Sequence, residues 1–401
     1  MDGISVQTGG QATISPQTCR AWEDAHSVGM YAKRDIVLVR GEGATVWDGA
    51  GRAYLDCTAG VGVANVGHAN AAVADAVSRQ ARLLVTCHGM FYNDARARLL
   101  KQLADIAPPG IDRFFLCNSG SEAVEGALKF ARMATGRSEV VAMVRGFHGK
   151  TFGALSATWE AKYREPFEPL VPGFRHVPLN DAAVLAEAVS ERTAAVLLEI
   201  IQGEGGIRPA SAEFLEAARR LCDERGALLI VDEVQTGLGR TGSWFACQGM
   251  GLRPDLVTMA KALGGGLAMG AVGVGPRVEN LQRLTHTTTF GGAPIACAAA
   301  SAVIAEVRRL DLLRHAAEAG GAFIDRLRVL NLRKVREVRG RGLMVGVELR
   351  QKAGPFLLPL AERGVLAMLA GNLVLRFLPP LVISEAELER VAAALEEVLH
   401  A

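Results

Sequence analysis

Lys261 is the residue of this sequence whose setting most directly suggests chemistry. It follows the apolar segment LVTMA and precedes ALGGG, so an apolar run and three glycines enclose one amine. Burial disfavours the charged form of an amine, and the pKa of Lys261 should therefore fall towards the range where the neutral form is available. A neutral amine attacks carbonyl groups and takes up protons. The alternative for this position is a strained lysine, or one that stretches its ammonium to solvent.

Asp232 stands in a comparable setting upstream of Lys261. It ends the apolar segment LLIV and is followed by Glu233 and Gln235. Open α/β sheets bind ligands beyond the ends of their parallel strands, and a carboxylate that emerges from such an apolar run needs a partner. For this position alone, an aspartate that caps the next turn is an equally good interpretation.

The segment NSGS, residues 118–121, lies between an apolar run and a strongly helical segment. The start of a helix offers free N–H groups and the positive end of the helix dipole, and the hydroxyls of Ser119 and Ser121 add donors, so this segment suits a phosphate group. The same residues also suit an ordinary N-cap or capping box.

Two further loops carry side chains of interest. Phe147 and His148 stand between glycines at the end of another apolar run, where an aromatic ring could stack on a flat cofactor or simply lie at the edge of the core. Glu204 lies in the glycine-rich segment QGEGG and could equally be an exposed loop acid.

The combination of these features indicates more than any of them alone. A lysine in an apolar setting, a strand-end acid, a phosphate site and an aromatic ring are the parts that a pyridoxal phosphate (PLP) enzyme needs. In such an enzyme the lysine forms a Schiff base and later carries a proton. The acid keeps the pyridine nitrogen protonated, so that the ring accepts electrons.

Composition narrows the class of protein. The 401 residues are 50% hydrophobic, and 44 Lys and Arg against 42 Asp and Glu give a formal net charge of +2. These interspersed charges predict neither nucleic-acid binding nor a polybasic membrane face. Seven scattered cysteines without a CxxC pair predict free thiols in a reducing compartment, with no disulfide framework and no metal site. The opening residues lack a signal-peptide pattern and no apolar stretch reaches membrane length, so we expect a cytoplasmic protein.

Apolar runs of strand length alternate with helical segments along most of the chain. A hairpin is expected over about residues 40–56 and a helix from about residue 70, followed by strands in RFFLC, EVVAM, TAAVLLE, ALLIV and LVTM. This pattern predicts an α/β fold with a mostly parallel sheet covered by helices on both faces. We expect a large domain over residues 61–295 and a smaller α+β domain over residues 296–401, joined by the N-terminal segment 1–60.

The motifs together resemble those of the class III (ornithine-type) aminotransferases, which use PLP on the type I fold. The segments that carry this resemblance are NSGSEAVEGALKFAR, GFHGKT, IQGEGGIRPA, DEVQTGLGRTG, PDLVTMAKALGGG and TTTFGGAP. Within the class, SATWEAKYREPF, GLMVGVELRQKAGPF and VLRFLPPLVI are similar to the acetylornithine aminotransferases. They are also similar to the branch that acts on carrier-bound aminoadipate semialdehyde in lysine synthesis.

The resemblance implies a role for each matching residue. Lys261 is the implied Schiff-base lysine, Asp232 pairs with the pyridine nitrogen, and Gln235 contacts the ring hydroxyl. Further implied cofactor contacts are Ser119, Gly120, Ser121, Phe147, His148, Val234 and Thr289, the last from the neighbouring subunit of a homodimer with shared active sites. Implied substrate contacts are Tyr31, Lys150, Glu204, Thr288 and Arg376. Of these, Arg376 grips the carboxylate beside the reacting amine of glutamate, and Glu204 masks or releases it.

One position departs from the family pattern in a way that bears on the substrate. The family usually has arginine after Phe-His-Gly, where this chain has Lys150. Lysine keeps the charge but loses the planar fork of donors that grips a carboxylate at two points. The identity of the acceptor therefore stays open at this position. By contrast, Ser121 in place of the usual threonine preserves the hydroxyl.

The implied reaction moves an amino group between glutamate, with its product 2-oxoglutarate, and an ω-semialdehyde of amino-acid biosynthesis. The expected acceptors are N-acetylglutamate semialdehyde and aminoadipate semialdehyde bound to a small acidic carrier protein. The alternatives are a 4-aminobutyrate or ornithine aminotransferase, a glutamate-semialdehyde aminomutase, and a non-catalytic relative that keeps the fold as a binding module.

Overall fold

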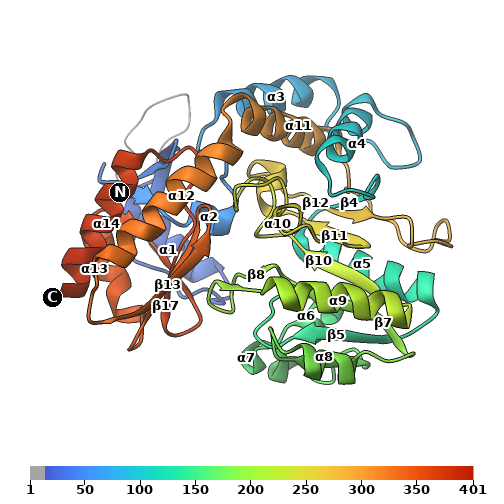
Figure 1. Cartoon of the computed structure of the whole chain (residues 1–401). Helices are drawn as coiled ribbons and strands as arrows, with labels where there is room; N and C mark the ends of the chain where they lie inside the picture. The colour runs from blue at the N-terminus through green and yellow to red at the C-terminus, as the bar shows by residue number, and fades with distance from the viewer. Residues whose placement is uncertain (1–13, 401) are drawn as a thin grey trace.

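The computed structural model describes residues 14–400 (Figure 1). Most of the opening stretch for which the sequence predicts no signal peptide lies outside the described residues. Within the described part, the chain forms one sheet-centred layered region and one smaller region that combines N-terminal and C-terminal segments (Figure 1).

The larger region is built on a seven-stranded sheet with the strand order β4-β12-β11-β10-β7-β5-β6. Its strands are β4 (Arg113–Cys117), β5 (Glu139–Met143), β6 (Phe174–Val177), β7 (Thr193–Leu198), β10 (Leu228–Asp232), β11 (Leu256–Met259) and β12 (Gly270–Val274). Neighbouring strands are parallel except around β12, which is antiparallel to both β11 and β4. The predicted strands and the mostly parallel sheet are confirmed.

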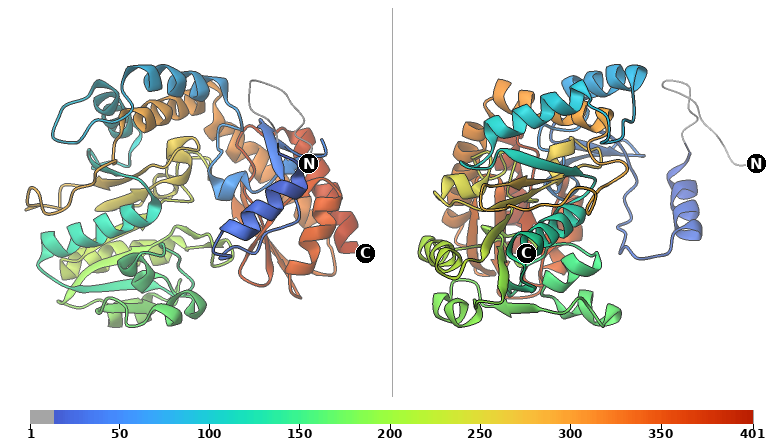
Figure 2. Two further views of the ribbon diagram at one scale, coloured as in Figure 1. Left: turned by 180° about the vertical axis from the view of Figure 1, so that it is seen from behind. Right: turned by 90° about the vertical axis from the view of Figure 1, so that its right-hand side faces the viewer.

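Successive apolar side chains along a strand point to opposite faces of the sheet, and this explains why helices cover both faces. On β10, Leu229 and Val231 belong to one apolar cluster with residues of α4 (Asp94–Ile106), α8 (Ala182–Ala188) and α9 (Ala212–Arg225). Leu228 and Ile230 point to the other cluster, with α5 (Gly120–Thr135) and α6 (Phe152–Ala157). Figure 1 has α9 in front of the sheet, and the view from behind in Figure 2 has α5 in front. Each such buried aliphatic side chain stabilises the fold by about 1.5–3 kcal/mol.

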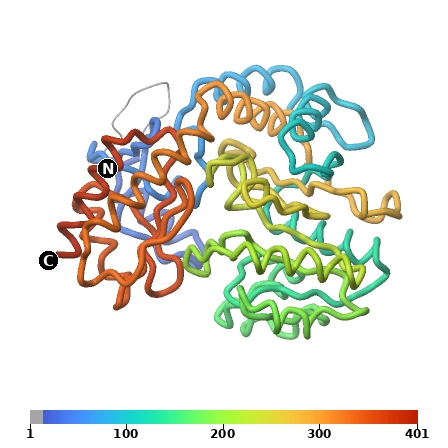
Figure 3. The backbone as a smooth tube through the Cα atoms, in the orientation of Figure 1, coloured from blue at the N-terminus to red at the C-terminus, as the bar shows by residue number. Residues whose placement is uncertain are grey.

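The smaller region joins sequence-distant strands. β1 (Leu38–Glu42), β2 (Thr45–Asp48) and β3 (Ala53–Asp56) form an antiparallel meander, and β15 (Val365–Leu366) pairs in parallel with β3. A second sheet contains β13 (Val335–Arg341), β14 (Met344–Leu349), β17 (Val374–Phe377) and β16 (Met368–Ala370). In Figure 3 the blue N-terminal and red C-terminal backbone accordingly lie side by side. The expected hairpin near residues 40–56 is thus part of a larger sheet.

Helices complete this smaller region and its border with the larger one. α12 (Leu312–Val329) and α14 (Glu385–His400) pack together, and α11 (Pro294–Arg309) packs on α3 (Ala71–Leu83) and α4. α11 supplies Ala300 and Ile304 to the core of the sheet region and Val303 and Val307 to the core of the smaller region. The predicted domain boundaries at residues 60 and 295 stay a prediction.

The remaining short elements are α1 (Pro16–His26), α2 (Ala59–Gly62), α7 (Ala161–Arg164), α10 (Ala246–Gly249), α13 (Leu357–Glu362), β8 (Ile201–Gln202), β9 (Arg208–Pro209) and the 3-10 turns η1 (Glu165–Phe167), η2 (Lys261–Gly264) and η3 (Gly354–Phe356).

Arg240 ties the loop after β10 to the smaller region. Its guanidinium is fully buried and donates to the carbonyls of Leu343 and Pro379 and to the side-chain oxygen of Asn65. Burial lowers the pKa of Arg240 to about 9, while the charge of Asp56 acts in the opposite direction. A buried charge is retained only where such acceptors satisfy it, so this contact fixes the two regions against each other.

Candidate active site

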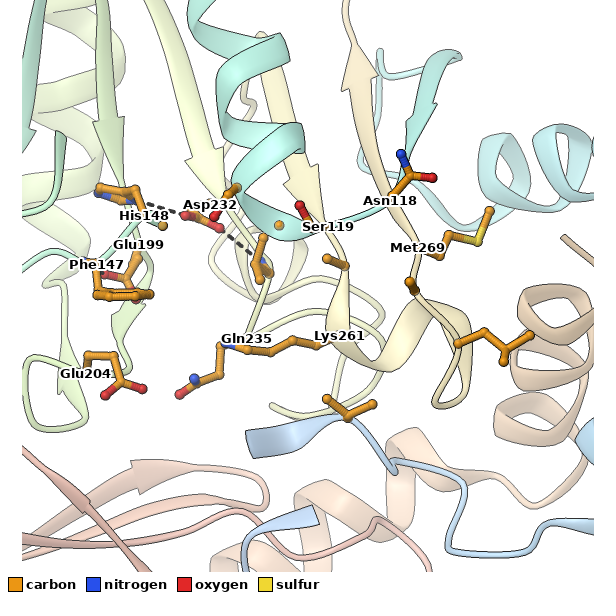
Figure 4. A pocket seen from close by; sticks show the side chains of 18 of the residues that line it. Asn118, Ser119, Phe147, His148, Glu199, Glu204, Asp232, Gln235, Lys261 and Met269 are labelled. Carbon is orange, nitrogen blue, oxygen red and sulfur yellow. Dashed lines mark hydrogen bonds and ion pairs between the residues drawn. The ribbon is translucent and has the colours of Figure 1, made fainter. Parts of the chain in front are cut away.

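A cavity of about 450 Å³ opens at one end of the central sheet (Figure 4). Its walls include residues at or shortly after the carboxyl ends of several strands: Asn118–Ser121 after β4, Phe147–Gly149 after β5, Glu199 after β7, Asp232 at the end of β10 and Ala260 with Lys261 after β11. Open α/β sheets bind ligands at this end of the sheet. The fold therefore brings side chains from five sequence-distant strands to one place.

Lys261 starts the short turn η2 and lines this cavity. Its backbone has a φ of 45°, a left-handed conformation that is uncommon outside glycine and is found in other proteins at functional sites. Burial lowers the pKa of Lys261, and the positive charge of Arg376 acts in the same direction, while Glu204 and Asp232 act against it. The pKa of Lys261 is thus lowered by burial, as expected from the sequence, which favours the neutral form of the amine over that of an exposed lysine.

Asp232 is held by three hydrogen bonds at the end of β10. One carboxylate oxygen lies 2.8 Å from Nδ1 of His148, and the other accepts from the Thr258 hydroxyl and the Val234 N–H at 3.0 Å each. Burial opposes the charged form of His148, but the hydrogen bond and the charge of Asp232 outweigh it and raise the pKa of the imidazole. The carboxylate is therefore fixed in place and carries its negative charge into the cavity wall (Figure 4).

The N-terminus of α5 forms another wall. Ser119 is its N-cap, and its hydroxyl accepts the N–H of Glu122 at 3.1 Å, so the capping interpretation of this motif holds. Gly120 is required here because a Cβ would lie 2.8 Å from Cγ1 of Val234. The same residues also line the cavity, together with Ser121, whose hydroxyl lies 3.3 Å from the N–H of Lys150. Ser119 thus caps α5 by accepting the Glu122 N–H, and the first residues of the helix also face the cavity.

A buried ion pair lies beside the cavity. Arg376 on β17 is 2% exposed, and its Nη1 lies 2.6 Å from a carboxylate oxygen of Glu204 and 3.4 Å from the amide oxygen of Gln235. Glu204 is therefore no exposed loop acid. A guanidinium so fully desolvated needs a carboxylate partner, which Glu204 supplies in this structure.

The structure brings most, but not all, predicted site residues to the cavity of one chain. Those that line it are Ser119, Gly120, Ser121, Phe147, His148, Glu204, Asp232, Val234, Gln235 and Lys261. Lys150 is exposed with its amine 5.0 Å from the ring centroid of Tyr163, and the Thr288 hydroxyl accepts from the Asn118 amide at 3.1 Å. Thr289 and Tyr31 are exposed and are not part of the cavity wall.

Sequence analysis missed some residues of the wall, notably Val63, Glu199 and Met269. Glu199 carried a usable signal, because an acid directly after the apolar run TAAVLL repeats the arrangement of Asp232. Val63 and Met269 are apolar and give no signal that distinguishes a cavity wall from a core.

Among residues 14–400, no helix is long and apolar enough to cross a membrane. Nor do three His, Cys, Asp or Glu side chains of the same residues lie together as metal ligands would. The seven cysteines are free, and five of them are buried.

Comparison with known proteins decides the family. The family model described as aminotransferase class-III matches residues 29–399, nearly the whole chain. The chain belongs to the class-III aminotransferases. The resemblance found in the sequence motifs is thereby confirmed, and this aminotransferase is an enzyme of the type I fold.

The relatives of this aminotransferase carry closely related names. It is 48% identical over 390 residues to the LysW-aminoadipate semialdehyde transaminase of Deinococcus radiodurans, covering 96% of the chain and 91% of the relative. It is 45% identical over 368 residues to the acetylornithine aminotransferase of Methanosarcina acetivorans, covering 92% of each. Among solved structures, an ornithine aminotransferase from Toxoplasma gondii with partial occupancy of PLP superposes with a TM-score of 0.92 at 32% identity, covering 96% of the chain and 94% of that structure.

The cofactor of this aminotransferase is PLP, and the residues present fit it. The N-terminus of α5 with Ser119, Gly120 and Ser121 would hold the phosphate group. The anchored carboxylate of Asp232 would pair with a protonated ring nitrogen, and the amine of Lys261 would bond to the aldehyde. Phe147 provides an aromatic wall for a flat ring.

Proposed function

We propose that this aminotransferase transfers an amino group from glutamate to an ω-semialdehyde of amino-acid biosynthesis. The acceptors we propose are N-acetylglutamate semialdehyde and aminoadipate semialdehyde on a small acidic carrier protein. The ion pair between Glu204 and Arg376 is the observation that carries this proposal. Relatives named for both acceptors, at 48% and 45% identity, support it.

The ion pair suits an enzyme that handles two unlike substrates in one cavity. Glutamate presents a carboxylate next to its reacting amine, and we infer that this carboxylate takes the place of Glu204 on Arg376. An ω-amine has no carboxylate at that position, and Glu204 then stays on Arg376 and keeps the buried charge paired. Arg376 thus binds the carboxylate of glutamate in one half-reaction and the carboxylate of Glu204 in the other.

Proton transfer in both half-reactions falls to Lys261. Bound PLP supplies an electron sink for the pair of electrons left when the Cα proton is removed. The neutral amine of Lys261 takes that proton from the donor and returns a proton on the side of the cofactor, and the second half-reaction reverses these transfers. Glutamate is oxidised to 2-oxoglutarate while the aldehyde is reduced to the amine, so no further oxidant or reductant is needed.

Asp232 and the start of α5 position the reacting groups rather than exchange protons with the substrate. The hydrogen bonds from His148, Thr258 and Val234 hold the carboxylate of Asp232, which keeps the ring nitrogen protonated and the electron sink strong. Ser119, Gly120 and Ser121 hold the phosphate.

We also propose a cytoplasmic homodimer with shared active sites. Exposed apolar side chains at the end of α3, on the segment after it and on the segment before α11 support an interface between two copies. They are Leu83, Val85, Met90, Phe91, Tyr92, Leu284 and Phe290. Thr289 belongs to the same exposed segment, where it would reach the phosphate of the partner copy. The seven free cysteines suit a reducing compartment.

A half-reaction experiment tests the substrate. The enzyme is converted to its amino form with glutamate, freed from excess substrate and mixed with one aldehyde at a time, while the visible absorbance of the lysine-bound cofactor is followed. We expect N-acetylglutamate semialdehyde or the carrier-bound semialdehyde to restore this absorbance faster than succinic semialdehyde. A faster return with succinic semialdehyde would replace the proposal by a 4-aminobutyrate aminotransferase.

The substitution Lys150→Arg is expected to favour the dicarboxylate substrate. Lys150 is exposed beside the cavity, and the planar fork of arginine would grip the second carboxylate of glutamate at two points where lysine makes a single contact. We expect kcat/KM for glutamate to rise about threefold to tenfold, mainly through KM. Steady-state kinetics with Lys162→Arg as the matched exposed control measures this. An unchanged KM would place the second carboxylate elsewhere.

A further inference from the structure

Glu199 joins two loops of the active site through one carboxylate. It directly follows β7, is 6% exposed and lines the cavity between Phe147 and His148 (Figure 4). One of its oxygens accepts the backbone N–H of Phe147 at 3.0 Å, and the other accepts the backbone N–H of Gly203 at 2.9 Å. The loop that carries the aromatic wall is thereby connected to the turn that carries Glu204.

The two loops depend on Glu199 to different degrees. The loop around Phe147 is also held by a bond from the Gly146 N–H to the Met143 carbonyl at 2.9 Å and by a bond from the His148 N–H to the Thr158 hydroxyl, also at 2.9 Å. The turn of residues 203–206 closes on itself through a long 3.4 Å bond between the Gly206 N–H and the Gly203 carbonyl. Within the turn, the backbone N–H of Gly203 is therefore held by the carboxylate of Glu199.

The start of the turn follows β8, where Gln202 pairs with Arg208 of β9 and its side chain donates to the Val144 carbonyl at 2.8 Å. Residue 203 itself is a glycine without a side chain to anchor, a Cβ there would press on the amide of Gln235, and its N–H donates to Glu199. The far end of the turn is held separately, since Arg208 donates to the Gly205 carbonyl at 3.1 Å and Arg339 donates to the Gly206 carbonyl. Glu204 thus sits between a fixed far end and the Gly203 N–H that Glu199 holds.

We propose that Glu199 is a positioning residue that holds Glu204 where it can pair with Arg376 during the ω-amine half-reaction. The proposal rests on the proposed function, in which Glu204 covers Arg376 whenever the substrate lacks a carboxylate beside its amine. Arg376 is 2% exposed, so an ill-placed Glu204 would leave a desolvated charge without its partner. In the glutamate half-reaction the carboxylate of the substrate fills this role, and the position of Glu204 matters less.

The electrostatics of Glu199 agree with a function of its charged form. Burial raises the pKa of Glu199 to about 7, with His148 and the two bound N–H groups acting in the opposite direction and Asp232 acting in the same direction. The ionised carboxylate accepts both N–H groups in charge-assisted hydrogen bonds, whereas protonation turns one oxygen into a weakly accepting hydroxyl. Because the pKa is raised, this form is populated above about pH 7 and is lost as the pH falls through that value.

The variant Glu199→Gln tests the proposal on the PLP-loaded enzyme. Its amide has one acceptor oxygen and one NH₂ group, and the NH₂ group must face one of the two N–H donors. Since other hydrogen bonds also hold the Phe147 loop, we expect the bond to the Gly203 N–H to be the one that is lost and the Gly203 turn to shift. We expect the single-turnover rate with N-acetylornithine to fall about tenfold or more and the rate with glutamate to fall less than about threefold. Both rates are measured from the visible absorbance of the cofactor.

Glu233→Gln is the matched control. Glu233 is 1% exposed and holds the N–H of Cys247 at 2.8 Å and the Thr236 hydroxyl, but it does not line the cavity. We expect this control to lower the thermal midpoint without changing the ratio of the two half-reaction rates. An equal loss in both half-reactions of Glu199→Gln, or no loss in either, would overturn the proposal.

The pH profile gives a second readout that a purely structural role would not move. We expect the wild-type rate with N-acetylornithine to rise as the pH rises through about 7 and the rate of Glu199→Gln to lack this step. The other charged groups near Glu199 are unchanged in the variant: His148, Glu204, Asp232, Lys261 and Arg376. A wild type that fails to react with glutamate would refute the proposed function itself, whatever the variant does.

Discussion

The variant Lys261→Ala is expected to lose transamination by at least about 10⁴-fold while keeping its fold. Alanine removes both the amine that bonds to the cofactor and the base that moves the proton, and the cavity of this chain has no second lysine in its wall. The fold should persist because burial already disfavours the charged form of this amine, so its removal leaves no stabilising ion pair broken. Half-reaction rates and the thermal midpoint together measure this outcome.

Two controls make the Lys261→Ala experiment specific. Lys129→Ala removes an exposed lysine from α5 and should leave the rates unchanged. Small primary amines added to Lys261→Ala should restore part of the rate, because they can enter the cavity and accept the proton. Normal turnover of Lys261→Ala would remove the centre of the proposed mechanism, and a lost fold would be visible in the thermal midpoint.

The strand-end residues could be predicted from the sequence because their signal is local. A polar residue directly after a short apolar run marks the carboxyl end of a buried strand, and this placed Asp232 and the segment 118–121 correctly at the sheet edge. Glu199 has the same local pattern after the run TAAVLL, but two further apolar residues separate it from the glycine-rich segment QGEGG, in which Glu204 drew the attention. The strand-end pattern of Glu199 can be read from the sequence. Its role follows only from the fold, which places the backbone N–H groups of Phe147 and Gly203 against its two oxygens.

The partner of Glu204 could not be derived from local patterns at all. Arg376 lies 172 residues further along the chain, on a strand of the smaller region, and no periodicity relates the two positions. Their contact depends on how the C-terminal strands return to the sheet region, which is decided by packing between two cores. The resemblance to the family predicted the role of Arg376, and the structure places its Nη1 2.6 Å from a carboxylate oxygen of Glu204.

A contact between two subunits cannot be derived from local patterns in one chain either. Thr289 is exposed and apart from the cavity of its own chain, which is where a residue that serves a partner copy would lie, while the expected substrate contact of Tyr31 stays a prediction. The proposed homodimer would also cover the exposed apolar side chains near Thr289, a group that monomeric proteins rarely leave uncovered.

The second large effect is expected from Asp232→Asn, which should lower kcat/KM by about 10²–10³-fold with PLP still bound. The asparagine oxygen can still accept from Thr258 and Val234, and its NH₂ group can donate to Nδ1 of His148 once that imidazole carries its proton on Nε2. Shape and hydrogen bonds are thus preserved while the negative charge disappears. Without that charge nothing keeps the ring nitrogen protonated, and proton removal by Lys261 becomes slow.

A change at His148 separates this electrostatic effect from simple distortion. Because the hydrogen bond and charge of Asp232 raise the pKa of His148, that pKa should fall in Asp232→Asn, which NMR titration of the imidazole measures. Asp255→Asn is the matched control, since Asp255 is also buried but pairs with Arg219 and Arg277 away from the cavity. That control should lose stability and keep the activity of its folded fraction. A wild-type rate in Asp232→Asn would show that the charge at this strand end has no part in the chemistry.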